Sequence, residues 1–544
     1  MKIAISQMNP RVGDVACNLK LILEAIKKAK AGHCQLLLFP ELAIVGYPPR
    51  DLLSYSHIVD ENLKALEKIK VESSGITILI GYVEKNLSNS GKPYFNSVAV
   101  FQNGNLIKNY RKWLLPYYDI FEEERYFEPG NETVVFQVMG KNIGLTICED
   151  LWNEPGFLPR DYAKKPIEAL MAHKLDLLVN ISASPFQLGK TQIREKLFQQ
   201  VSKKIKAPVV FCNQVGANDE LIFDGASFVI TEQGKQMQAK AFEVDFQEWN
   251  LETKPCLVTN SFTTEAGVVI EALALGIRDY VEKSRLKTVC IGLSGGIDSS
   301  VVAALAVKAL GPKRVFGFAL PSKFNASHSL EDAEILAANL GITCNTISIE
   351  TLFQEFEKQL TKTLGQCPKS LTLENIQPRI RMTLLMGLAN EAGHLLLNTS
   401  NKSEIAMGYA TQYGDTAGAI AVLGDLTKHQ VYSLAQEINL GTEVIPYRAI
   451  TRAPSAELKE NQKDQDSLPS YDILDKIVES HIEQSQPLSP GSAPETPIQF
   501  IQLVSRLNAA SEYKRHQLPP VLRVSSKAFG MGRRIPIVGR KPSE

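Results

Sequence analysis

The 544-residue sequence lacks several features that would each point to a particular class of protein. Lys and Arg together number 59, and so do Asp and Glu, so the formal net charge is zero. A chain without excess positive charge shows no general tendency to bind nucleic acid or an acidic membrane surface. No apolar run approaches the roughly 20 residues that a membrane-spanning helix needs. We therefore expect no nucleic acid and no membrane among its partners.

Paired cysteines are also absent, because none of the eight cysteines belongs to a CxxC motif. Several lie inside apolar runs, such as Cys212 in PVVFC and Cys290 in TVCIGL. This placement argues against a secreted disulfide framework and favours reduced thiols. The first residues, MKIAISQMNPRVGD, contain no long apolar segment, so we predict no signal peptide and a cytoplasmic location.

The first half of the sequence reads as short strands with a few helices. Seven apolar, β-rich segments lie at residues 3–7, 35–39, 76–82, 97–101, 143–147, 176–182 and 208–212. Residues 18–30 show helical periodicity, with Asn18 as the predicted N-cap. The tetrapeptide QNGN at 102–105 predicts a hairpin between two strands. Strands covered by helices indicate an α/β sandwich.

The second half follows a different pattern, which divides the chain into two predicted domains. Residues 246–263 interrupt the first pattern, so we expect them to link a domain at 1–245 to one at 264–544. After a predicted helix at about 264–283, β and α segments alternate, which is typical of a parallel, doubly wound sheet. Residues 483–498 are rich in Ser and Pro without periodicity, and we predict a mobile loop there.

The most specific motif is GLSGGIDSS, at residues 292–300, between a predicted strand and a predicted helix. Paired glycines let the backbone turn tightly, and exposed N–H groups at a helix start favour phosphate oxygens. Ser294 and Ser299 add hydroxyl donors. Asp298 beside a phosphate needs a divalent cation between them, so we predict that it is a Mg²⁺ ligand. No Gly-Lys-Ser/Thr follows, which excludes a Walker A loop.

This loop resembles that of the ATP pyrophosphatase family, which includes NAD synthetase, GMP synthetase and asparagine synthetase. The resemblance implies adenylation of a substrate with loss of pyrophosphate, and not γ-phosphoryl transfer. Further strings are similar to NAD synthetase and not to its relatives, across almost all of 264–540. They are PSKFNASHSLEDA (321–333), ENIQPRIR (374–381), NTSNKSEIAMGYATQYGDTAGAIAVLGDLTKHQ (398–430), PSAEL (454–458), DQDSLPSYDILD (464–475) and EYKRHQLPP (512–520).

The NAD synthetase resemblance implies roles for individual residues. The ATP-binding positions are Gly292, Leu293, Ser294, Gly295, Gly296, Ile297, Asp298, Ser299, Thr399 and Lys428. The deamido-NAD-binding positions are Asn375, Glu404, Asp415 and Lys514, and the Mg²⁺ ligands are Asp298 and Glu404. The two lysines would offset phosphate charge, and Glu404 follows a predicted strand end, where a doubly wound sheet binds its ligands.

Two positions depart from the family pattern. The family usually has Gly where this chain has Ser400, and it commonly has Ala where this chain has Pro378. We place Pro378 early in a predicted helix at 376–391, where a missing backbone N–H is tolerated.

Three motifs in the first half each contain a side chain that could take part in catalysis. Glu41 (FPELAIVGYPPRDLL) and Cys148 (LTICEDLWNEP) follow apolar strands, and Lys112 lies in YRKWLLPYYDIFEEERYFEPG. A thiol is mostly protonated at neutral pH, so it needs a base and a positive neighbour. Glu41 would take the thiol proton and later return it to a leaving group. Lys112 would stabilise the thiolate and the oxyanion of a tetrahedral intermediate.

These strings resemble the nitrilase (carbon–nitrogen hydrolase) family across about 1–245. The resemblance implies an αββα sandwich with Glu41, Lys112 and Cys148 as the catalytic triad, and with Glu123 as a second glutamate that positions the lysine and the substrate. In the NAD synthetase branch this domain is a glutaminase. The matching glutamine-binding positions are Tyr118, Ser184 and Lys190, where Lys190 stands in place of the Arg of some members.

Both resemblances together imply a glutamine-dependent NAD synthetase, in which ammonia from L-glutamine amidates deamido-NAD through an adenylate. The implied co-substrate is ATP with Mg²⁺, the products are NAD, AMP, pyrophosphate and glutamate, and the family implies a homo-oligomer with a closed ammonia passage. Three alternatives remain open at this point. They are another amidating ligase of the same loop family, a catalytically inactive nucleotide-binding regulator, and a nitrilase-type amidase that a nucleotide domain regulates.

Overall fold

The computed structural model describes residues 1–544 except 253–262, 461, 488–496 and 540–544. The chain forms two compact units, Met1–Thr263 and Thr264–Glu544. Much of the predicted linker 246–263 and of the predicted mobile loop 483–498 lies outside the described residues. No helix in the described part of the chain has the length and apolar character that a membrane span requires.

Unit 1 is built on two mixed six-stranded sheets. The first has the order β14-β1-β2-β3-β4-β5, with β1 (Lys2–Gln7), β2 (Leu36–Leu38), β3 (Thr77–Lys85), β4 (Tyr94–Gln102), β5 (Asn105–Arg111) and β14 (Asp245–Asn250). The second has the order β13-β12-β9-β8-β7-β6, with β6 (Val135–Val138), β7 (Lys141–Ile147), β8 (Leu177–Ser182), β9 (Val209–Asn213), β12 (Phe228–Thr231) and β13 (Gly234–Gln238). A separate hairpin pairs β10 (Val215–Asn218) with β11 (Leu221–Asp224).

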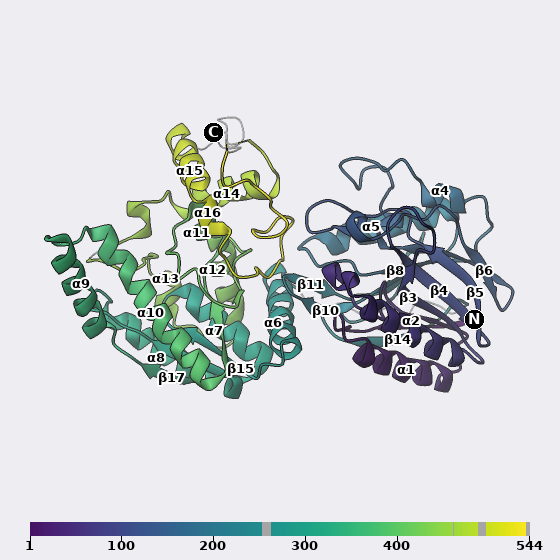
Figure 1. The fold of residues 1–544 in the computed structure, drawn as a ribbon, viewed down its shortest axis with the longest axis horizontal. Helices are drawn as coiled ribbons and strands as arrows, with labels where there is room; N and C mark the ends of the chain where they lie inside the picture. Colours follow the sequence, from purple (N-terminus) through teal and green to yellow (C-terminus); the bar gives the residue numbers. More distant parts are fainter. Residues whose placement is uncertain (253–262, 461, 488–496, 540–544) are drawn as a thin grey trace. The chain divides into compact units, whose positions relative to one another are not determined.

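Helices cover the outer faces of both sheets. The helices of this unit are α1 (Val15–Ala31), α2 (Ser56–Val71), α3 (Glu123–Tyr126), α4 (Pro166–Leu170) and α5 (Lys190–Ile205), and its 3₁₀ turns are η1 (Arg50–Ser54) and η2 (Cys148–Leu151). A shared core, with Leu79 from one sheet and Ile147 from the other, fills the space between the sheets. α1 and α2 pack on the first sheet, and α4 and α5 on the second (Figure 1). Both faces of each sheet are therefore buried, which explains the apolar strands of the sequence. The αββα prediction is confirmed.

The predicted strands and the hairpin at 102–105 are confirmed, but the predicted helix cap is wrong. α1 begins at Val15, and the side chain of Asp14 accepts the N–H of Cys17 as the N-cap. Asn18 lies inside the helix and is fully buried. Its amide donates to the carbonyls of Arg11 and Ile44, so it braces two loops and does not cap the helix. A short polar side chain can serve either purpose, and only tertiary contacts distinguish them.

Unit 2 contains a five-stranded parallel sheet in the order β17-β16-β15-β18-β19. Its strands are β15 (Thr288–Gly292), β16 (Val315–Ala319), β17 (Thr343–Thr346), β18 (His394–Asn398) and β19 (Ile420–Ala421). Its helices are α6 (Glu265–Lys283), α7 (Ile297–Leu310), α8 (Ser327–Leu340), α9 (Glu350–Leu364), α10 (Ser370–Ala392), α11 (Lys402–Met407), α12 (Lys428–Ile438), α13 (Tyr447–Thr451), α14 (Tyr471–Val478), α15 (Ile498–Ala510) and α16 (Glu512–Arg515). Short turns lie at η3 (Pro312–Arg314), η4 (Asp464–Asp466) and η5 (Glu479–Glu483).

The strand order of this sheet creates one place where a ligand can bind. The chain moves outward from β15 through β16 to β17 and then returns to the other side of β15 as β18. The loops that follow β15 and β18 therefore diverge, and a crevice opens beyond the carboxyl ends of these strands. α9 and α10 pack on one face of the sheet through Phe353 and Leu385, while α7 packs against β15 and β16 (Figure 1). The predicted doubly wound sheet is confirmed.

The position predicted for Pro378 is wrong. α10 starts at Ser370 and not at residue 376, so Pro378 is an interior residue of a long helix. The ring of Pro378 packs beside Gly414, where a Cβ atom would lie only 2.9 Å from the proline Cβ. Tertiary packing against a residue without a side chain thus accommodates a proline that helix propensity alone would disfavour.

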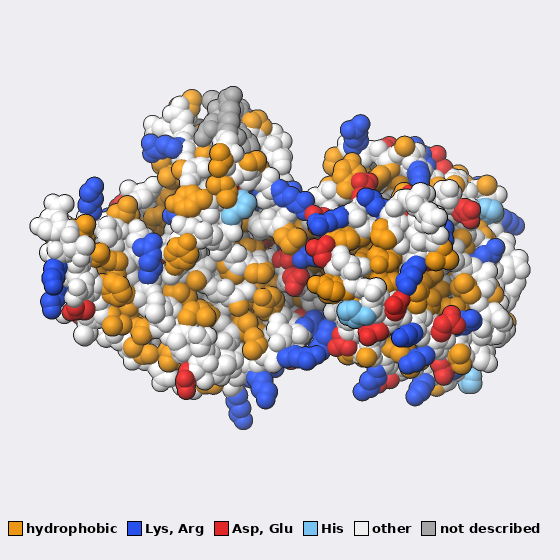
Figure 2. Space-filling model, in the orientation of Figure 1, with side chains coloured by type: hydrophobic (Ala, Val, Ile, Leu, Met, Phe, Trp, Pro, Cys, Tyr) orange, Lys and Arg blue, Asp and Glu red, His pale blue; other side chains and the backbone are white. Residues whose placement is uncertain are grey.

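The surface of unit 1 carries mixed charge. On the face drawn in Figure 2, Lys and Arg side chains of this unit are interspersed with Asp and Glu side chains. Partly exposed ion pairs in this unit include Lys85 with Asp60 and Lys30 with Glu72. Exposed pairs of this kind contribute little to stability.

Candidate active sites

Cys148 lies at the point where β7 ends and η2 begins. Its backbone has φ 41°, a left-handed conformation that is uncommon for a residue with a side chain. The residue is 8% exposed, and it belongs to the core between the two sheets. Strained backbone at a strand end often presents a reactive side chain to a cleft. The conformation therefore agrees with the sequence-based expectation that Cys148 is a nucleophile.

The three other residues of the predicted thiol site form one buried ion-pair cluster. The Nζ atom of Lys112 donates to Oε1 of Glu41 at 2.7 Å and to the two carboxylate oxygens of Glu123 at 2.8 and 2.9 Å. The backbone N–H of Ala183 donates to the second oxygen of Glu41 at 2.9 Å. Glu41 and Lys112 are each 1% exposed. Residues from three separate segments thus converge next to Cys148.

The electrostatics of this cluster depend on its burial. Burial and the carboxylate of Glu41 raise the pKa of Cys148, while the ammonium of Lys112 opposes the shift. Burial also raises the pKa of Glu123 to about 7, against the influence of Lys112. Burial would lower the pKa of Lys112, but its two carboxylate partners hold that pKa well above its usual value. The lysine therefore stays charged, and the thiol is a neutral group that needs a base before it can attack a carbonyl.

Asp150 is a part of this site that the sequence interpretation missed, although it adjoins Cys148 in the string CED. Its Oδ1 accepts the backbone N–H groups of Trp113 and Leu114, which directly follow Lys112. Its Oδ2 accepts the N–H of Ile147, which precedes Cys148. Although burial raises the pKa of Asp150 to about 6, the group is ionised at neutral pH. One buried carboxylate thus ties the lysine segment to the cysteine segment.

If the site hydrolyses glutamine, as the sequence motifs predict, Asp150→Asn should reduce that activity about 10²-fold, because an amide nitrogen would face backbone N–H groups that now donate to a carboxylate oxygen. The measurement is glutamate release at saturating glutamine, with thermal unfolding to confirm that the variant is folded. Asp176→Asn is the control, because Asp176 also accepts a backbone N–H, from Asn142, but is partly exposed. Equal losses in both variants would contradict a specific role for Asp150.

Two of the three predicted glutamine-binding residues, Tyr118 and Lys190, lie near a second buried carboxylate, that of Glu149. Tyr118 donates its hydroxyl to Glu149 at 2.9 Å, and Lys190 is close enough to affect the pKa of Glu149, which burial raises. Ser184 accepts a hydrogen bond from Arg194, at 3.4 Å. The sequence interpretation did not include Glu149 or Arg194. The position of Glu149 directly after Cys148 could have indicated a role for Glu149, but no sequence signal pointed to Arg194. The site therefore offers both a cation and carboxylates to a zwitterionic substrate.

The second candidate site is a cavity of about 300 Å³ in unit 2, at the crevice between the loops that follow β15 and β18. It is lined by most of the predicted nucleotide residues, namely Gly292, Leu293, Ser294, Gly296, Ile297, Asp298, Ser299, Thr399, Glu404, Asp415 and Lys428. Gly295 has φ 73°, and a Cβ atom there would overlap the carbonyl of Ser329, so this position requires glycine. The loop therefore turns tightly into the start of α7, as the motif predicts.

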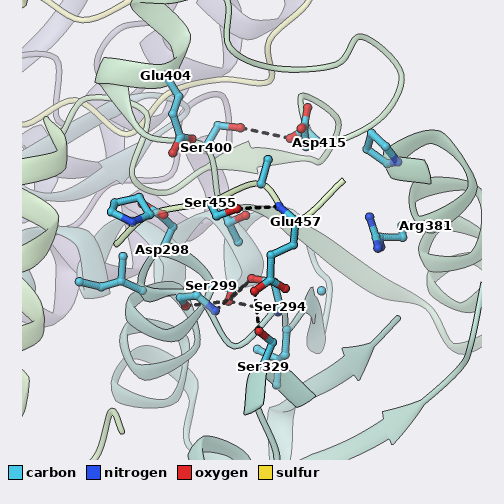
Figure 3. A pocket seen from close by; sticks show the side chains of 18 of the residues that line it. Ser294, Asp298, Ser299, Ser329, Arg381, Ser400, Glu404, Asp415, Ser455 and Glu457 are labelled. Atoms are coloured by element: carbon cyan, nitrogen blue, oxygen red, sulfur yellow. Dashed lines mark hydrogen bonds between the residues drawn. The ribbon is translucent and has the colours of Figure 1, made fainter. Parts of the chain in front are cut away.

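Asp298 and Glu404 meet at one side of this cavity through a shared lysine. The Nζ atom of Lys428 lies 2.5 Å from Asp298 and 3.3 Å from Glu404. Burial raises the pKa of Glu404 to about 8, although Lys428 opposes this shift. Figure 3 shows both carboxylates on one side of the cavity, with Arg381 on the other. Two carboxylates that share one lysine supply the hard oxygen donors that Mg²⁺ prefers. Among the described residues no group of three such side chains forms.

Only some of the residues predicted to bind deamido-NAD line this cavity. Asp415 lines the cavity, and burial raises its pKa to about 6. Asn375 and Lys514 are not among the lining residues, but both contact the segment that ends at Asp415: Asn375 accepts the hydroxyl of Thr411, and Lys514 donates to two backbone carbonyls of that segment. Ser400 has no positive φ, so its departure from glycine leaves this backbone unstrained.

Other lining residues were not identified from the sequence. Arg381 donates to the carbonyl of Leu320 and to Asn325, and burial lowers its pKa to about 10. Arg452 donates to the hydroxyl of Ser329 at 2.8 Å and lies beside the glycine loop. Arg381 belongs to the string ENIQPRIR, so the motif contained this signal, whereas nothing in the sequence distinguished Arg452 from a surface arginine.

Comparisons with known proteins match each half of the chain to a known family. The carbon-nitrogen hydrolase family model matches residues 2–244, and the NAD synthase family model matches residues 269–518. A glutamine-dependent NAD(+) synthetase of Synechocystis sp. is 40% identical, over 98% of this chain and 98% of that protein. The chain belongs to the glutamine-dependent NAD(+) synthetase family.

Further members of the glutamine-dependent NAD(+) synthetase family extend this result. The enzyme of Acinetobacter baylyi is 38% identical, over 100% of this chain and 99% of its own. The solved structure of the Acinetobacter baumannii enzyme, which contains adenosine diphosphate, is 35% identical with a TM-score of 0.78, and the match covers 98% of each chain. The structure from Cytophaga hutchinsonii is 23% identical with a TM-score of 0.83, over 99% of this chain and 97% of that one, and supports the fold alone.

Proposed function

We propose that this chain makes NAD from deamido-NAD in an ATP-dependent reaction, with ammonia that it releases from L-glutamine. The observation that carries the proposal is the coexistence, in one chain, of a buried Glu–Lys–Cys site and a lysine-free glycine loop at the switch point of a parallel sheet. The first arrangement suits amide hydrolysis, and the second suits a reaction that releases pyrophosphate. Family membership along nearly the whole chain supports the substrates.

In unit 1, the proposed reaction begins when the Sγ atom of Cys148 attacks the side-chain amide carbon of glutamine. Glu41 accepts the thiol proton and then gives it to the leaving nitrogen, so that ammonia departs and a glutamyl thioester remains. Lys112 stabilises the negative oxygen of the tetrahedral intermediate. Water, activated by Glu41, then hydrolyses the thioester to glutamate and restores the thiol. Glu123 keeps Lys112 in place through two hydrogen bonds.

Recognition of glutamine would use the polar groups around Glu149. The substrate's α-ammonium group would pair with this buried carboxylate, which accepts hydrogen bonds from Tyr118 and Tyr162. Lys190 would pair with the α-carboxylate of the substrate, less directionally than an arginine. Ser184 would supply a further hydroxyl, next to Arg194.

In unit 2, the glycine loop binds the phosphates of ATP through the backbone N–H groups at the start of α7. The carboxylate of deamido-NAD attacks the α-phosphorus, pyrophosphate leaves, and an acyl adenylate remains. Ammonia then attacks the carbonyl carbon of the adenylate, which gives NAD and AMP. Lys428, which now neutralises two carboxylates, would turn toward the developing negative charge on phosphate.

Mg²⁺ fits the carboxylate pair of Asp298 and Glu404, because both groups already surround one positive charge, that of Lys428. Bound there, the ion would neutralise phosphate oxygens and so favour departure of pyrophosphate. Asn401 donates to Oδ1 of Asp298 at 2.9 Å and would keep this carboxylate oriented. Free ammonia becomes ammonium near neutral pH, so efficient use of glutamine also requires that the nitrogen reach the adenylate without equilibrating with solvent.

The test is to incubate the full chain with Mg-ATP, deamido-NAD and glutamine that carries ¹⁵N in its side-chain amide. We expect NAD with one ¹⁵N atom in its carboxamide, and no NAD when any one substrate is omitted. Xanthosine monophosphate in place of deamido-NAD tests the alternative ligase, and amidation of that nucleotide would contradict the proposal. Unlabelled NAD formed from labelled glutamine would contradict transfer of the amide nitrogen.

A further inference from the structure

Asn96 occupies the centre of the thiol site, although no sequence motif pointed to it. It lies on β4, opposite Val83 of β3, and only 1% of it is exposed. Its Nδ2 donates to Oε1 of Glu41 at 2.7 Å and to Oε2 of Glu123 at 3.3 Å. Its backbone carbonyl accepts the N–H of Lys112 at 2.9 Å. A single residue thus contacts both carboxylates and the backbone of the lysine between them.

The charges in this cluster explain why an amide donor is needed. Two glutamates share one ammonium group, that of Lys112, so the buried set carries a net negative charge when both carboxylates are ionised. The hydroxyl of Tyr47 donates to Glu123 at 2.9 Å. The other titratable groups close enough to interact with this cluster are the thiol of Cys148 and the carboxyl groups of Glu149 and Asp150. None of these groups supplies positive charge. Among the described residues, the second oxygen of Glu41 accepts a hydrogen bond only from the backbone N–H of Ala183.

The orientation of the Asn96 amide favours the carboxylates at a cost. Its Oδ1 atom is buried and has no hydrogen-bond partner among the described residues. A buried carbonyl without a donor is unfavourable. The orientation of the side chain therefore satisfies its two N–H groups, which donate to the carboxylates, and leaves its oxygen without a hydrogen bond. A residue that only filled space on β4 would not need this arrangement. The unmatched oxygen therefore indicates a purpose other than packing.

We propose that Asn96 is a positioning residue that keeps the Glu41–Glu123 pair ionised, so that Glu41 is ready to accept the proton of Cys148. The inference rests on the proposed amide-hydrolysing role of this site. A donor to the ionised form of a carboxylate favours that form, and one amide that reaches both carboxylates reduces their mutual repulsion. Without Asn96 the pair would take up a proton at higher pH, and Glu41 would then be unable to act as the base.

The test compares Asn96→Ala with the unaltered protein by the pH dependence of glutamate release from glutamine. We expect kcat to fall about 10- to 100-fold with little change in KM. The acidic limb of the profile should move upward by about one pH unit, because a donor to the ionised pair has been removed. Asn96→Asp, which replaces the donor by a third carboxylate with nearly the same shape, should move the limb further in the same direction.

Asn62→Ala is the matched control. Asn62 is fully buried, and it exchanges hydrogen bonds with the backbone of Val83, the residue opposite Asn96 on β3. Its side chain has no hydrogen bond to the carboxylates, so its loss should leave the acidic limb in place even if the fold is weakened. A limb that stays at its original pH in the folded Asn96 variants would overturn the proposal and leave only a structural role.

A second readout separates this inference from the proposed function. The rate of alkylation of Cys148 by iodoacetamide, followed at the level of the peptide by mass spectrometry, needs no substrate. Its pH profile should shift upward in Asn96→Ala and not in Asn62→Ala. If the unaltered protein released no glutamate from glutamine, the proposed function would fail, whereas the alkylation profile would still support or contradict the role of Asn96.

Discussion

Replacing Cys148 by alanine is expected to abolish NAD synthesis from glutamine and to leave synthesis from ammonium salts nearly intact. The variant retains the cluster of Lys112, Glu41 and Glu123, but it has no atom that can form the thioester. Loss of a covalent nucleophile typically costs on the order of 10³-fold or more in rate. The measurement is NAD formation with each nitrogen source at saturating Mg-ATP and deamido-NAD.

Cys212→Ala is the matched control for this experiment. Cys212 is a fully buried thiol on β9. Its pKa is raised by burial, without a contribution from a charged group. Cysteines of this kind act as small apolar side chains. The Cys212→Ala variant should therefore make NAD from glutamine and from ammonium salts as well as the unaltered protein does. If Cys148→Ala lost both activities to the same extent while remaining folded, the separation of the two reactions between the units would be wrong.

The opposite pattern is expected for Asp298→Asn. The amide would keep the hydrogen bond that Asn401 now donates to Oδ1. It would remove one of the two negative charges, those of residue 298 and Glu404, that face Lys428. We expect synthesis to fall about 10³-fold with either nitrogen source, because a metal ligand that neutralises phosphate contributes several kcal/mol to the transition state. Release of glutamate from glutamine, measured without ATP, should continue.

Two comparisons make this result specific. Asp472→Asn removes an exposed carboxylate from the start of α14 and should leave both reactions unchanged. Raising the Mg²⁺ concentration should partly restore Asp298→Asn if the carboxylate is a metal ligand, because weaker binding is offset by mass action. Pyrophosphate release at the normal rate in Asp298→Asn would contradict the assignment of this residue.

The fold could be predicted closely because its main signals are local. Apolar segments such as 143–147 and 176–182 are strands in which both faces are buried, so periodicity and composition agree. The loop at 292–300 follows β15 and opens α7 as its glycines predict. Asn18 and Pro378 were misplaced because their environments depend on segments distant in the sequence, namely Ile44 and Gly414.

The same distinction applies to the sites. Glu41, Lys112, Cys148 and Asp298 each lie in a recognisable string. The first three follow strand ends, and Asp298 lies in the first turn of α7. Asn96, on β4, and Asp150, in η2, act through hydrogen bonds to segments that are distant in the sequence. A buried Asn or Asp of this kind has no distinctive local pattern. Such residues become visible only when the partners of each buried polar atom are known.

The central claim is that unit 2 drives amidation by transferring AMP from ATP to a carboxylate. The most direct measurement is ³¹P NMR of the complete reaction with ammonium chloride as the nitrogen source, which does not depend on the thiol site. The account predicts AMP and pyrophosphate in amounts equal to the NAD that is formed. The appearance of ADP and orthophosphate in their place would contradict it.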